Sequence, residues 1–268
     1  MPKFLAPQFL AIGSGKGGTG KTLVAVSLAH ALAHEGEKVL LCDADLGLSN
    51  TTVHLGLDEG GDFAGVMAGR RTVAEAVVPA FGGIKERGGF DVLAAPAGSG
   101  ALADITEQQS RHLIETLRAA KQYDRIVLDL GAGVDATTMY FAASSDSTLL
   151  ILTPDPASLA DAYAFAKLLK KRGAKLPYVV VNMAANDAEA RRTSGALGTT
   201  CQAFLGAVPE YLGGIPRDPH VSEAVRRQSH LLTLHPQAAA SLAICTVARR
   251  LHNKITPAPS TRLASGLR

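Results

Sequence analysis

The sequence has few cysteines, and it lacks any apolar run long enough to cross a membrane. Cys42, Cys201 and Cys245 are scattered among 268 residues, with no pair at CxxC spacing. The absence of such a pair excludes a local zinc or iron–sulfur motif, and scattered cysteines are typical of a reduced compartment. No run reaches the roughly 18 apolar residues that a spanning helix needs, and no long apolar signal core precedes residue 9. We therefore expect a cytoplasmic protein.

Acidic residues are absent from the last part of the chain. Residues 241–268 contain five basic side chains and no acidic one: Arg249, Arg250, Lys254, Arg262 and Arg268. Subtracting these five from the 27 basic residues leaves 22 against 24 acidic residues in the body. A nearly neutral body gives no electrostatic reason to expect nucleic-acid binding. The basic C-terminal region predicts, at most, weak peripheral contact with the inner face of the cell membrane.

Short apolar runs alternate with longer helical patterns. Strands are expected at residues 9–13, 38–42, 91–95, 125–130, 147–153, 178–182 and 206–213. Several are continuously apolar, which is typical of central parallel strands buried on both faces. Helices are expected at residues 21–34, 106–121, 136–143, 158–171, 187–204, 221–228 and 236–252. This alternation predicts an α/β fold with a doubly wound, mainly parallel sheet flanked by helices.

The chain has no internal repeat and no long linker, so we expect one domain over residues 1–255 and a polar, flexible tail over residues 256–268. The last helix should pack on the body through an apolar face made of Leu242, Ile244, Val247, Ala248, Leu251 and Ile255. His30 and His34 lie one turn apart on the first helix, and we expect them on its solvated side.

A phosphate-binding loop is the clearest motif of the sequence. Its eight residues fit G-x-x-x-x-G-K-[ST] after an apolar strand and before a helix: Gly15, Lys16, Gly17, Gly18, Thr19, Gly20, Lys21 and Thr22. Glycines let backbone N–H groups turn toward phosphate oxygens, and the helix N-terminus adds its positive dipole end. Lys21 would reach the β- and γ-phosphates, and the Thr22 hydroxyl would ligate Mg²⁺. We expect ATP or ADP with Mg²⁺ as ligands.

A dinucleotide-binding loop is a competing interpretation of the same segment. Residues 13–18 also satisfy G-x-G-x-x-G, with Asp43 and Asp45 after the next strand. That pattern leaves Lys21 and Thr22 at the helix start without a role, whereas the phosphate-loop pattern requires both.

Lys16 lies inside the loop and gives the stretch Lys-Gly-Gly-Thr-Gly-Lys-Thr, which resembles the deviant Walker A motif of the MinD/ParA superfamily. Further similar stretches lie at residues 43–50, 95–100, 123–133, 153–156, 161–163, 181–183 and 212–219. The segment at residues 43–50 is most similar to that of flagellar-number regulators of the FlhG/FleN type. The resemblance implies an ATP-dependent homodimer in which Lys16 reaches the partner's ATP; the alternative is a solvated loop lysine.

Several acids follow apolar strands and are candidates for the metal and catalytic sites. Asp129 ends one strand and Asp43 its neighbour, so both should face Mg²⁺, Asp129 through water. By resemblance, Asp45 orients the attacking water, which makes Lys16, Lys21 and Asp45 the catalytic set. For each acid the alternative is a helix cap or a turn residue. Asp155 and Asp161 are candidate partners of Lys16 in one nucleotide state, with helix capping as their alternative.

The resemblance also implies where the adenine base would bind. Asn182, at the end of a strand, is similar to a residue that hydrogen-bonds the base, and the alternative is a left-handed turn residue. Pro216, Arg217 and Asp218 would flank the base, partly through backbone groups.

The resemblance implies a slow ATPase, stimulated by an unidentified partner protein, that regulates the placement or number of a structure. A flagellum is the first expectation and the division site the second. Alternatives are a DNA-partitioning ATPase and a nucleotide-gated scaffold with little turnover. The missing CxxC argues against a metal-cluster carrier, and a tail without tyrosine argues against a tyrosine autokinase. The glutamine-containing activator motif found in many flagellar regulators is missing before residue 9.

Overall fold

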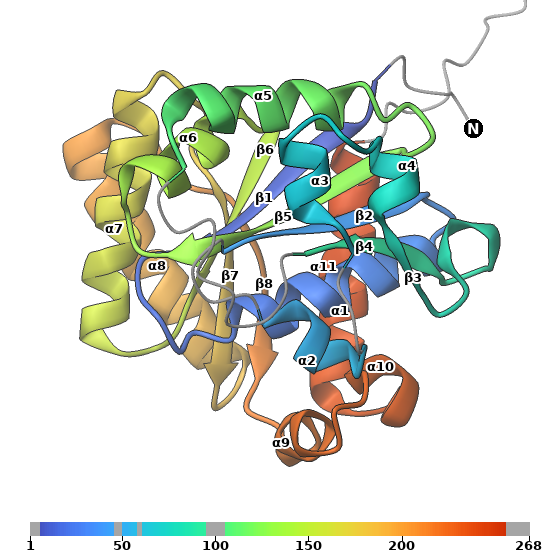
Figure 1. Ribbon diagram of the computed structural model, residues 1–268. Helices are drawn as coiled ribbons and strands as arrows, with labels where there is room; N and C mark the ends of the chain where they lie inside the picture. The colour runs from blue at the N-terminus through green and yellow to red at the C-terminus, as the bar shows by residue number, and fades with distance from the viewer. Residues whose placement is uncertain (1–5, 46–49, 58–60, 95–104, 256–268) are drawn as a thin grey trace, which may run out of the picture.

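Eight strands form one sheet in the computed structural model, which describes residues 6–45, 50–57, 61–94 and 105–255 (Figure 1). The spatial order is β3-β4-β2-β5-β1-β6-β7-β8, and all neighbouring strands are parallel except β3, which runs antiparallel to β4. The strands are β1 (Gln8–Ser14), β2 (Val39–Ala44), β3 (Val78–Ala80), β4 (Phe90–Leu93), β5 (Arg125–Ala132), β6 (Ser147–Leu152), β7 (Tyr178–Ala184) and β8 (Tyr211–Pro216).

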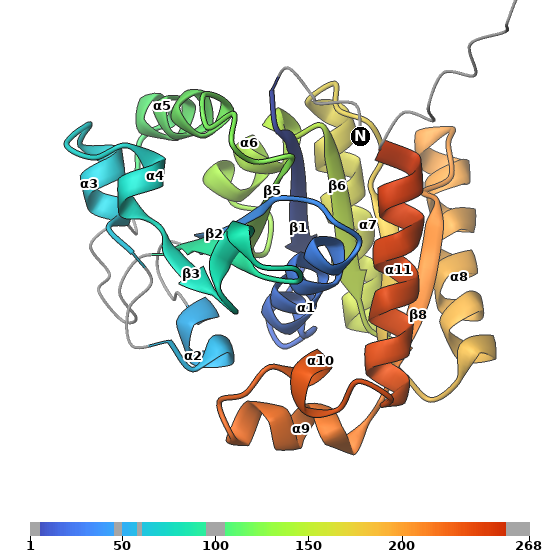
Figure 2. The same cartoon turned by 90° about the vertical axis from the view of Figure 1, so that its right-hand side faces the viewer.

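Helices connect the strands and lie on both faces of the sheet (Figure 2). They are α1 (Lys21–His34), α2 (Thr51–Leu55), α3 (Phe63–Met67), α4 (Val73–Ala76), η1 (Gly83–Lys85), α5 (Glu107–Arg118), α6 (Ala136–Ser144), α7 (Pro156–Lys171), α8 (Asp187–Leu205), α9 (Pro219–Arg226), α10 (Leu231–Leu234) and α11 (Ala239–Ile255). Within the described residues, none of them combines the length and the apolar composition that a membrane crossing requires. The architecture confirms the expected doubly wound α/β fold.

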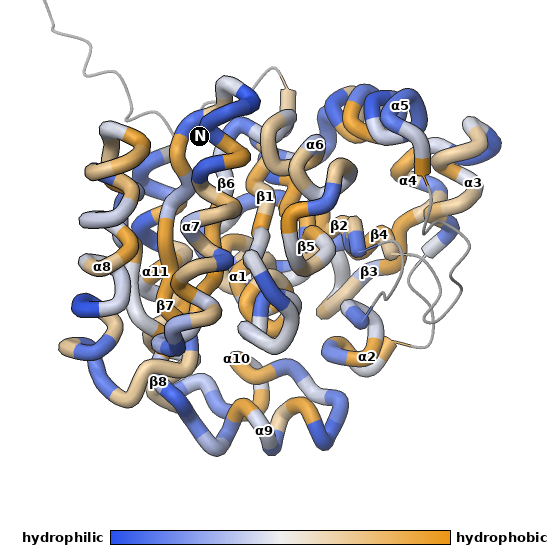
Figure 3. The backbone as a smooth tube through the Cα atoms, turned by 90° about the vertical axis from the view of Figure 1, so that its left-hand side faces the viewer, coloured by the Kyte–Doolittle hydropathy of each residue, from blue (hydrophilic) through white to orange (hydrophobic). Residues whose placement is uncertain are grey.

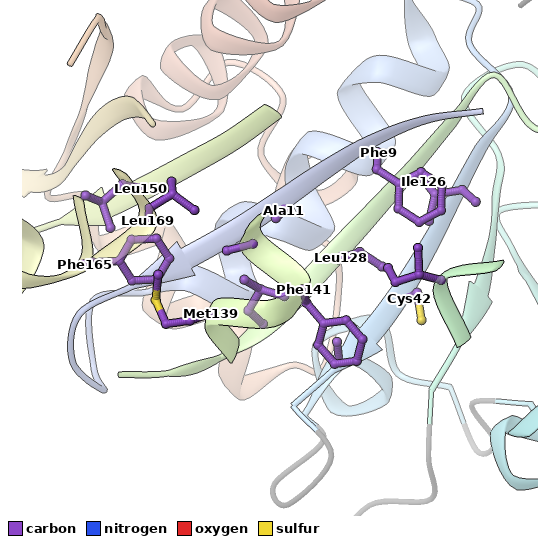
Figure 4. Packing of buried hydrophobic residues seen from close by; sticks show 14 of the residues in the cluster. Phe9, Ala11, Cys42, Ile126, Leu128, Met139, Phe141, Leu150, Phe165 and Leu169 are labelled. Carbon is purple, nitrogen blue, oxygen red and sulfur yellow. The ribbon is translucent and has the colours of Figure 1, made fainter. Parts of the chain in front are cut away.

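The sheet separates two apolar cores, because its central strands are buried on both faces. One core packs α3 to α8 against the sheet, and Figure 4 shows part of it, including Phe9, Phe141 and Phe165. The other core packs α1 and α9 to α11 against the opposite face. The central strands are accordingly among the most apolar segments in Figure 3. This double burial explains why the strand sequences are continuous apolar runs rather than alternating ones.

The parallel arrangement gives the sheet two different edges. We call the edge where the parallel strands end the carboxyl edge, and the edge where they begin the amino edge. In Figure 2, α9 and α10 lie at the bottom, beyond the carboxyl edge. The C-terminal end of α11 lies at the top, near the start of β1. Loops that follow parallel strands meet at the carboxyl edge, which is therefore where a ligand site is expected.

Most expected elements are confirmed, but the last strand was wrongly placed. Residues 206–213 were expected as a strand, whereas Gly206 caps α8 in a left-handed conformation and β8 runs over Tyr211–Pro216. A glycine in the left-handed conformation can end a helix without steric cost. The surrounding sequence does not show whether Gly206 ends a helix or begins a strand. The short elements α2, α3, α4, β3, η1 and α10 were not predicted. The expected tail at residues 256–268 lies outside the described part of the chain.

The last helix packs on the body as expected, with one correction. Ile244, Val247, Ala248 and Leu251 are buried, but Leu242 is 49% exposed. The packed face of α11 already begins with Ala240 and Ser241, which are fully buried, and Leu242 lies on the outer side of the helix.

The C-terminal end of α11 is fixed by a buried charge network. Arg125 donates to Glu37 through Nε at 2.5 Å and Nη2 at 2.8 Å, and the two side chains are 1% and 5% exposed. His252 of α11 is 2.6 Å from the same carboxylate. Glu37 therefore joins the start of β5 to the last helix, and losing it would leave the Arg125 charge buried without a counter-ion.

We predict that Glu37→Ala lowers the free energy of unfolding by about 3–5 kcal/mol, because an unpaired charge in the interior is costly. The matched control is Glu210→Ala, which breaks the more exposed pair between Glu210 and Lys254 of α11 and should cost no more than about 1 kcal/mol. Urea unfolding of both variants measures the difference. Equal losses of unfolding free energy in the two variants would show that the Glu37 network stabilises the fold no more than an exposed ion pair does.

Three histidines form a chain of ring contacts between α1 and α10. The Nδ1 atoms of His30 and His230 are 2.8 Å apart, and the Nε2 atoms of His34 and His30 are 3.0 Å apart. The expectation that both α1 histidines are solvated holds for His34 but is wrong for His30, which is 5% exposed. Phe81 stacks on the His30 ring and α10 covers it. Burial lowers the pKa of His30 to about 4 and that of His230 to about 3.

These two pKa values predict loss of stability in mild acid. Both rings have folded-state pKa values below the ordinary 6.5, so below that pH the unfolded chain binds protons that the folded chain does not. The free energy of unfolding should be highest above pH 6.5. It should fall as the pH drops toward 4, by about 2 kcal/mol per ring at pH 5. Urea unfolding of the native chain and of His230→Leu, at pH 7.5 and pH 5, tests this. The variant should lose less between the two pH values, and an equal loss would contradict the assignment.

Candidate functional site

The phosphate loop lies at the carboxyl edge, between β1 and α1. Gly20 adopts a left-handed conformation (φ 81°) directly before the first residue of α1. A Cβ at Gly15 would lie 2.4 Å from the carbonyl carbon of Asp161, so only glycine fits against α7 there. A Cβ at Gly17 or Gly18 would meet nothing within 4 Å. One side of the loop is thus packed on the protein, and the other is open to a ligand.

Lys21 and Asp129 form a buried ion pair at the base of the loop. Lys21 Nζ donates to Asp129 Oδ1 at 2.6 Å, and the side chains are 6% and 1% exposed. Burial raises the pKa of Asp129 to about 6, although the Lys21 ammonium lowers it. Asp129 is therefore a carboxylate held in its charged form mainly by Lys21, close to the Thr22 hydroxyl that also lowers its pKa.

The oxygen atoms around this pair fit a magnesium ion. Asp129 Oδ2 and Thr19 Oγ1 are buried without a hydrogen-bond partner among the described residues. Buried polar atoms are normally satisfied, so each of these unpaired oxygens indicates a missing partner. Mg²⁺ prefers hard oxygen ligands of this kind, together with phosphate and water. The residues expected at the metal, Thr22 and Asp129, are brought together by the structure.

Asp43 lies beside Asp129 because the two residues are register partners on β2 and β5. Its Oδ1 accepts from Asp45 N at 3.0 Å, and its Oδ2 accepts from Thr51 N at 3.3 Å. The Asp43 carboxylate thereby holds both ends of the segment that links β2 to α2. Asp45 faces Gly131, since a Cβ there would be 3.9 Å from Asp45 Oδ1. The two stretches at residues 43–50 and 123–133 that resemble the MinD/ParA superfamily thus meet at this point.

Lys16 points to a different partner from Lys21. Its ammonium is 2.8 Å from Asp155 Oδ1, and the side chains are 34% and 44% exposed. Hydrogen bonds from Lys16, Thr153 and the Ser158 N–H hold the pKa of Asp155 well below its usual range. Asp155 also caps α7, so pairing and capping, which the sequence left as alternatives, occur together. Asp161 packs its backbone against Gly15, and no ion pair between Asp161 and Lys16 occurs among the described residues.

Asn182 links the phosphate loop to β7. Its Nδ2 donates to Thr19 O at 2.7 Å, and its Oδ1 accepts from Met183 N at 2.9 Å. The left-handed conformation falls on the next residue, Met183 (φ 57°), and not on Asn182. In this arrangement the side chain positions the loop, and its expected contact with adenine stays a prediction.

The residues expected around the base lie at the end of β8. Pro216 pairs with Ala184 of β7, and Arg217 N donates to Ala184 O at 2.9 Å. Asp218 caps α9 through His220 N and also accepts from Ala240 N of α11, both at 3.0 Å. Asp218 therefore holds the loop in place through its side chain, while Arg217 is exposed beside the phosphate loop.

These parts border one open cavity of about 440 Å³. Its wall consists of Lys16, Gly17, Gly18, Thr153, Pro154, Asp155, Met183, Ala185, Glu189 and Arg217. Ala185 and Glu189 were not singled out from the sequence, and only their closeness to Asn182 could have suggested them. Three larger hollows, of about 810, 650 and 610 Å³, lie between α8 and the start of β8, at the amino edge and along α5, away from the loop. The chemistry of the phosphate loop, rather than volume, identifies the site.

Comparison with known proteins agrees with this geometry. The chain is 34% identical over 253 residues to the antiactivator FleN of Pseudomonas aeruginosa, covering 94% of this chain and 88% of FleN. It is 31% identical to the flagellum site-determining protein YlxH of Helicobacter pylori, covering 92% and 83%. The solved structure of the cell division ATPase MinD from Pyrococcus furiosus is 27% identical, with a TM-score of 0.75 over 92% of this chain and 99% of that one.

A family description also covers most of the chain. The CobQ/CobB/MinD/ParA nucleotide binding domain matches residues 10–232, which include the phosphate loop, both acidic strand ends and the β8 loop. The dinucleotide reading of residues 13–18 is thereby set aside in favour of the phosphate loop. The chain belongs to the CobQ/CobB/MinD/ParA family of nucleotide-binding domains and resembles its flagellar regulators over most of its length.

Proposed function

We propose that this protein is an ATP-driven dimerisation switch that hydrolyses ATP slowly and regulates the placement or number of a cellular structure. The names of its relatives support a flagellum first, through FleN and YlxH, and the division site second, through the septum site-determining protein MinD of Synechocystis, which is 28% identical. We further propose a cytoplasmic location.

One observation carries the proposal: the loop has two lysines with different environments. Lys21 is buried at the helix start, where it serves the phosphates of its own subunit. Lys16 lies on the open side, a third exposed, and is held by Asp155. A second cation on the outer side of the loop is not needed for binding within one subunit. It is well placed to reach the nucleotide of a second copy, where it would stabilise charge on the transferring phosphoryl group.

Nucleotide binding must change the ion pairs within the site. The phosphates compete with Asp129 for the Lys21 ammonium, which frees a carboxylate for the metal region. Mg²⁺, held near Thr22, Asp43 and Asp129, would neutralise phosphate charge. Asp45 orients the water whose oxygen bonds to the γ-phosphorus as the bond to the β-phosphate oxygen breaks. The backbone of residues 15–20 binds the phosphates, and Asn182, Pro216, Arg217 and Asp218 surround the base.

A partner protein completes the proposed cycle. The described residues supply no arginine positioned in the phosphate loop cavity except Arg217 on its base side, so unassisted hydrolysis should be slow. The MinD of Aquifex aeolicus, 28% identical with a TM-score of 0.75, has been solved as a complex with MinC. We propose an equivalent stimulating or effector protein here, and weak peripheral membrane contact through the basic C-terminal region.

We predict that Lys16→Ala abolishes ATP-dependent dimerisation, because the outer cation of the loop is lost while Lys21 and Thr22 remain. Light scattering with ATP or a slowly hydrolysed analogue should report a dimer for the native chain and a monomer for the variant. Lys38→Ala, at an exposed lysine of the amino edge, is the control and should dimerise normally. A native chain that binds ATP but stays monomeric would contradict the switch.

We also predict that Asp45→Ala lowers ATP turnover by about 10²–10⁴-fold while nucleotide binding and the dimer persist, because only the positioning of water is removed. Steady-state phosphate release, measured beside light scattering, separates the two effects. Asp62→Ala, at an acid that caps α3 away from the loop, provides the control. Turnover equal to that of the native chain would favour a different water-positioning group.

A further inference from the structure

The C-terminal ends of α7 and α8 form a surface that the switch does not use. We call it the basic corner and define it by Lys170, Lys171, Arg172, Lys175, Phe204 and Val208. Both helices begin at the carboxyl edge and end at the amino edge, so the corner lies across the sheet from the phosphate loop. Nucleotide chemistry and dimer contacts at the loop would therefore leave it accessible.

The corner carries an uncompensated positive charge. Residues 162–186 contain five basic residues and no acidic one. Lys170, Lys171, Arg172 and Lys175 are all exposed, and the Lys170 ammonium also donates to the Leu205 carbonyl at the end of α8. That bond ties the charges to the neighbouring helix end.

Two acids line the adjoining hollow at the amino edge, and both already have basic partners. Asp146 lies 3.7 Å from Arg118, and Glu210 lies 2.6 Å from Lys254. Neither acid neutralises the charges of α7, so an anionic surface could approach them without displacing an acid.

Large apolar side chains project from the same corner. Phe204 is 74% exposed, more than any other large apolar side chain among the described residues, and its ring lies edge-on to Tyr163 with the centroids 6.1 Å apart. Val208 is 57% exposed and lines a hollow with Lys175 and Lys254. Exposed phenylalanine amid lysine and arginine is unfavourable in water, but it suits an interface where the ring enters an apolar layer and the cations meet anions.

We propose that the basic corner docks the folded domain on a bilayer that contains anionic lipids. The charge of α7 and the exposed ring and valine both fit a lipid surface. A nucleic acid would use the charges and would leave Phe204 and Val208 unexplained. Lys254, near the end of α11, adds a further cation because it lines the hollow next to Val208. The corner goes beyond the dimer switch and does not depend on it.

Flotation of the full chain with lipid vesicles tests the proposal. Vesicles of phosphatidylglycerol and phosphatidylcholine should bind the native chain without nucleotide, and binding should fall with added salt; vesicles of phosphatidylcholine alone should not bind it. The double variants Phe204→Ser/Val208→Ser and Lys171→Glu/Arg172→Glu should each reduce the apparent affinity by at least about tenfold. Leu242→Ser, at an exposed apolar residue of the carboxyl-edge end of α11, and Arg70→Glu/Arg226→Glu, with the same charge change elsewhere, should bind as the native chain does.

Several outcomes would overturn the proposal. Native-like vesicle binding by both corner variants would place the contact elsewhere, for example in residues 256–268. Salt-dependent binding to duplex DNA that is lost in Lys171→Glu/Arg172→Glu and kept in Phe204→Ser/Val208→Ser would assign the corner to nucleic acid. Light scattering with ATP, run on every variant, keeps the two proposals apart. Corner variants that dimerise but no longer float support the corner, whereas a native chain that floats but never dimerises contradicts only the switch.

Discussion

The ion pair between Lys21 and Asp129 is the interaction on which the site depends. It joins the first residue of α1 to β5 at 2.6 Å, in a place where water hardly reaches either group. A buried charge pair of this kind contributes little net stability but becomes unfavourable as soon as one partner leaves. In the proposed cycle, phosphate and Mg²⁺ would each replace one partner of the pair. Nucleotide binding would then be coupled to the strand that also positions Asp43, through the β2–β5 register.

The doubly wound sheet divides the molecule into two functional edges. Strand ends at the carboxyl edge bring together loops from β1, β2, β5, β7 and β8, which are far apart in the sequence. At the amino edge, the Glu37 network fixes α11 while α7 and α8 end in exposed basic and apolar residues. A chain built this way can exchange nucleotide at one edge while the other edge remains available for attachment.

Local spacing in the sequence was enough to predict the fold and the family and to propose the site residues. The loop at residues 15–22, Asp129 at the end of an apolar run and the alternation of strands and helices are all readable within a window of about ten residues. Gly206 shows where prediction from the local sequence fails. Glycine fits a strand end or a helix end, and only the packing of α8 against β7 and β8 decides between them. The prediction that His30 is solvated failed for the same reason. The rings packed against it, Phe81 and His230 at the N-cap of α10, are distant from it in sequence.

By itself, the sequence determined the nucleotide loop, the fold class and the family, since each follows from short-range order of residue types. Tertiary structure alone decided the partners of those residues. It placed Lys16 on Asp155, 139 positions away, Asn182 on the carbonyl of Thr19, and Lys170 on the carbonyl of Leu205. Hydrogen bonds and ion pairs require distances near 3 Å, and sequence spacing cannot fix such distances between separate strands. Which lysine is buried against Asp129 and which is partly exposed beside Asp155 is therefore a property of the folded chain.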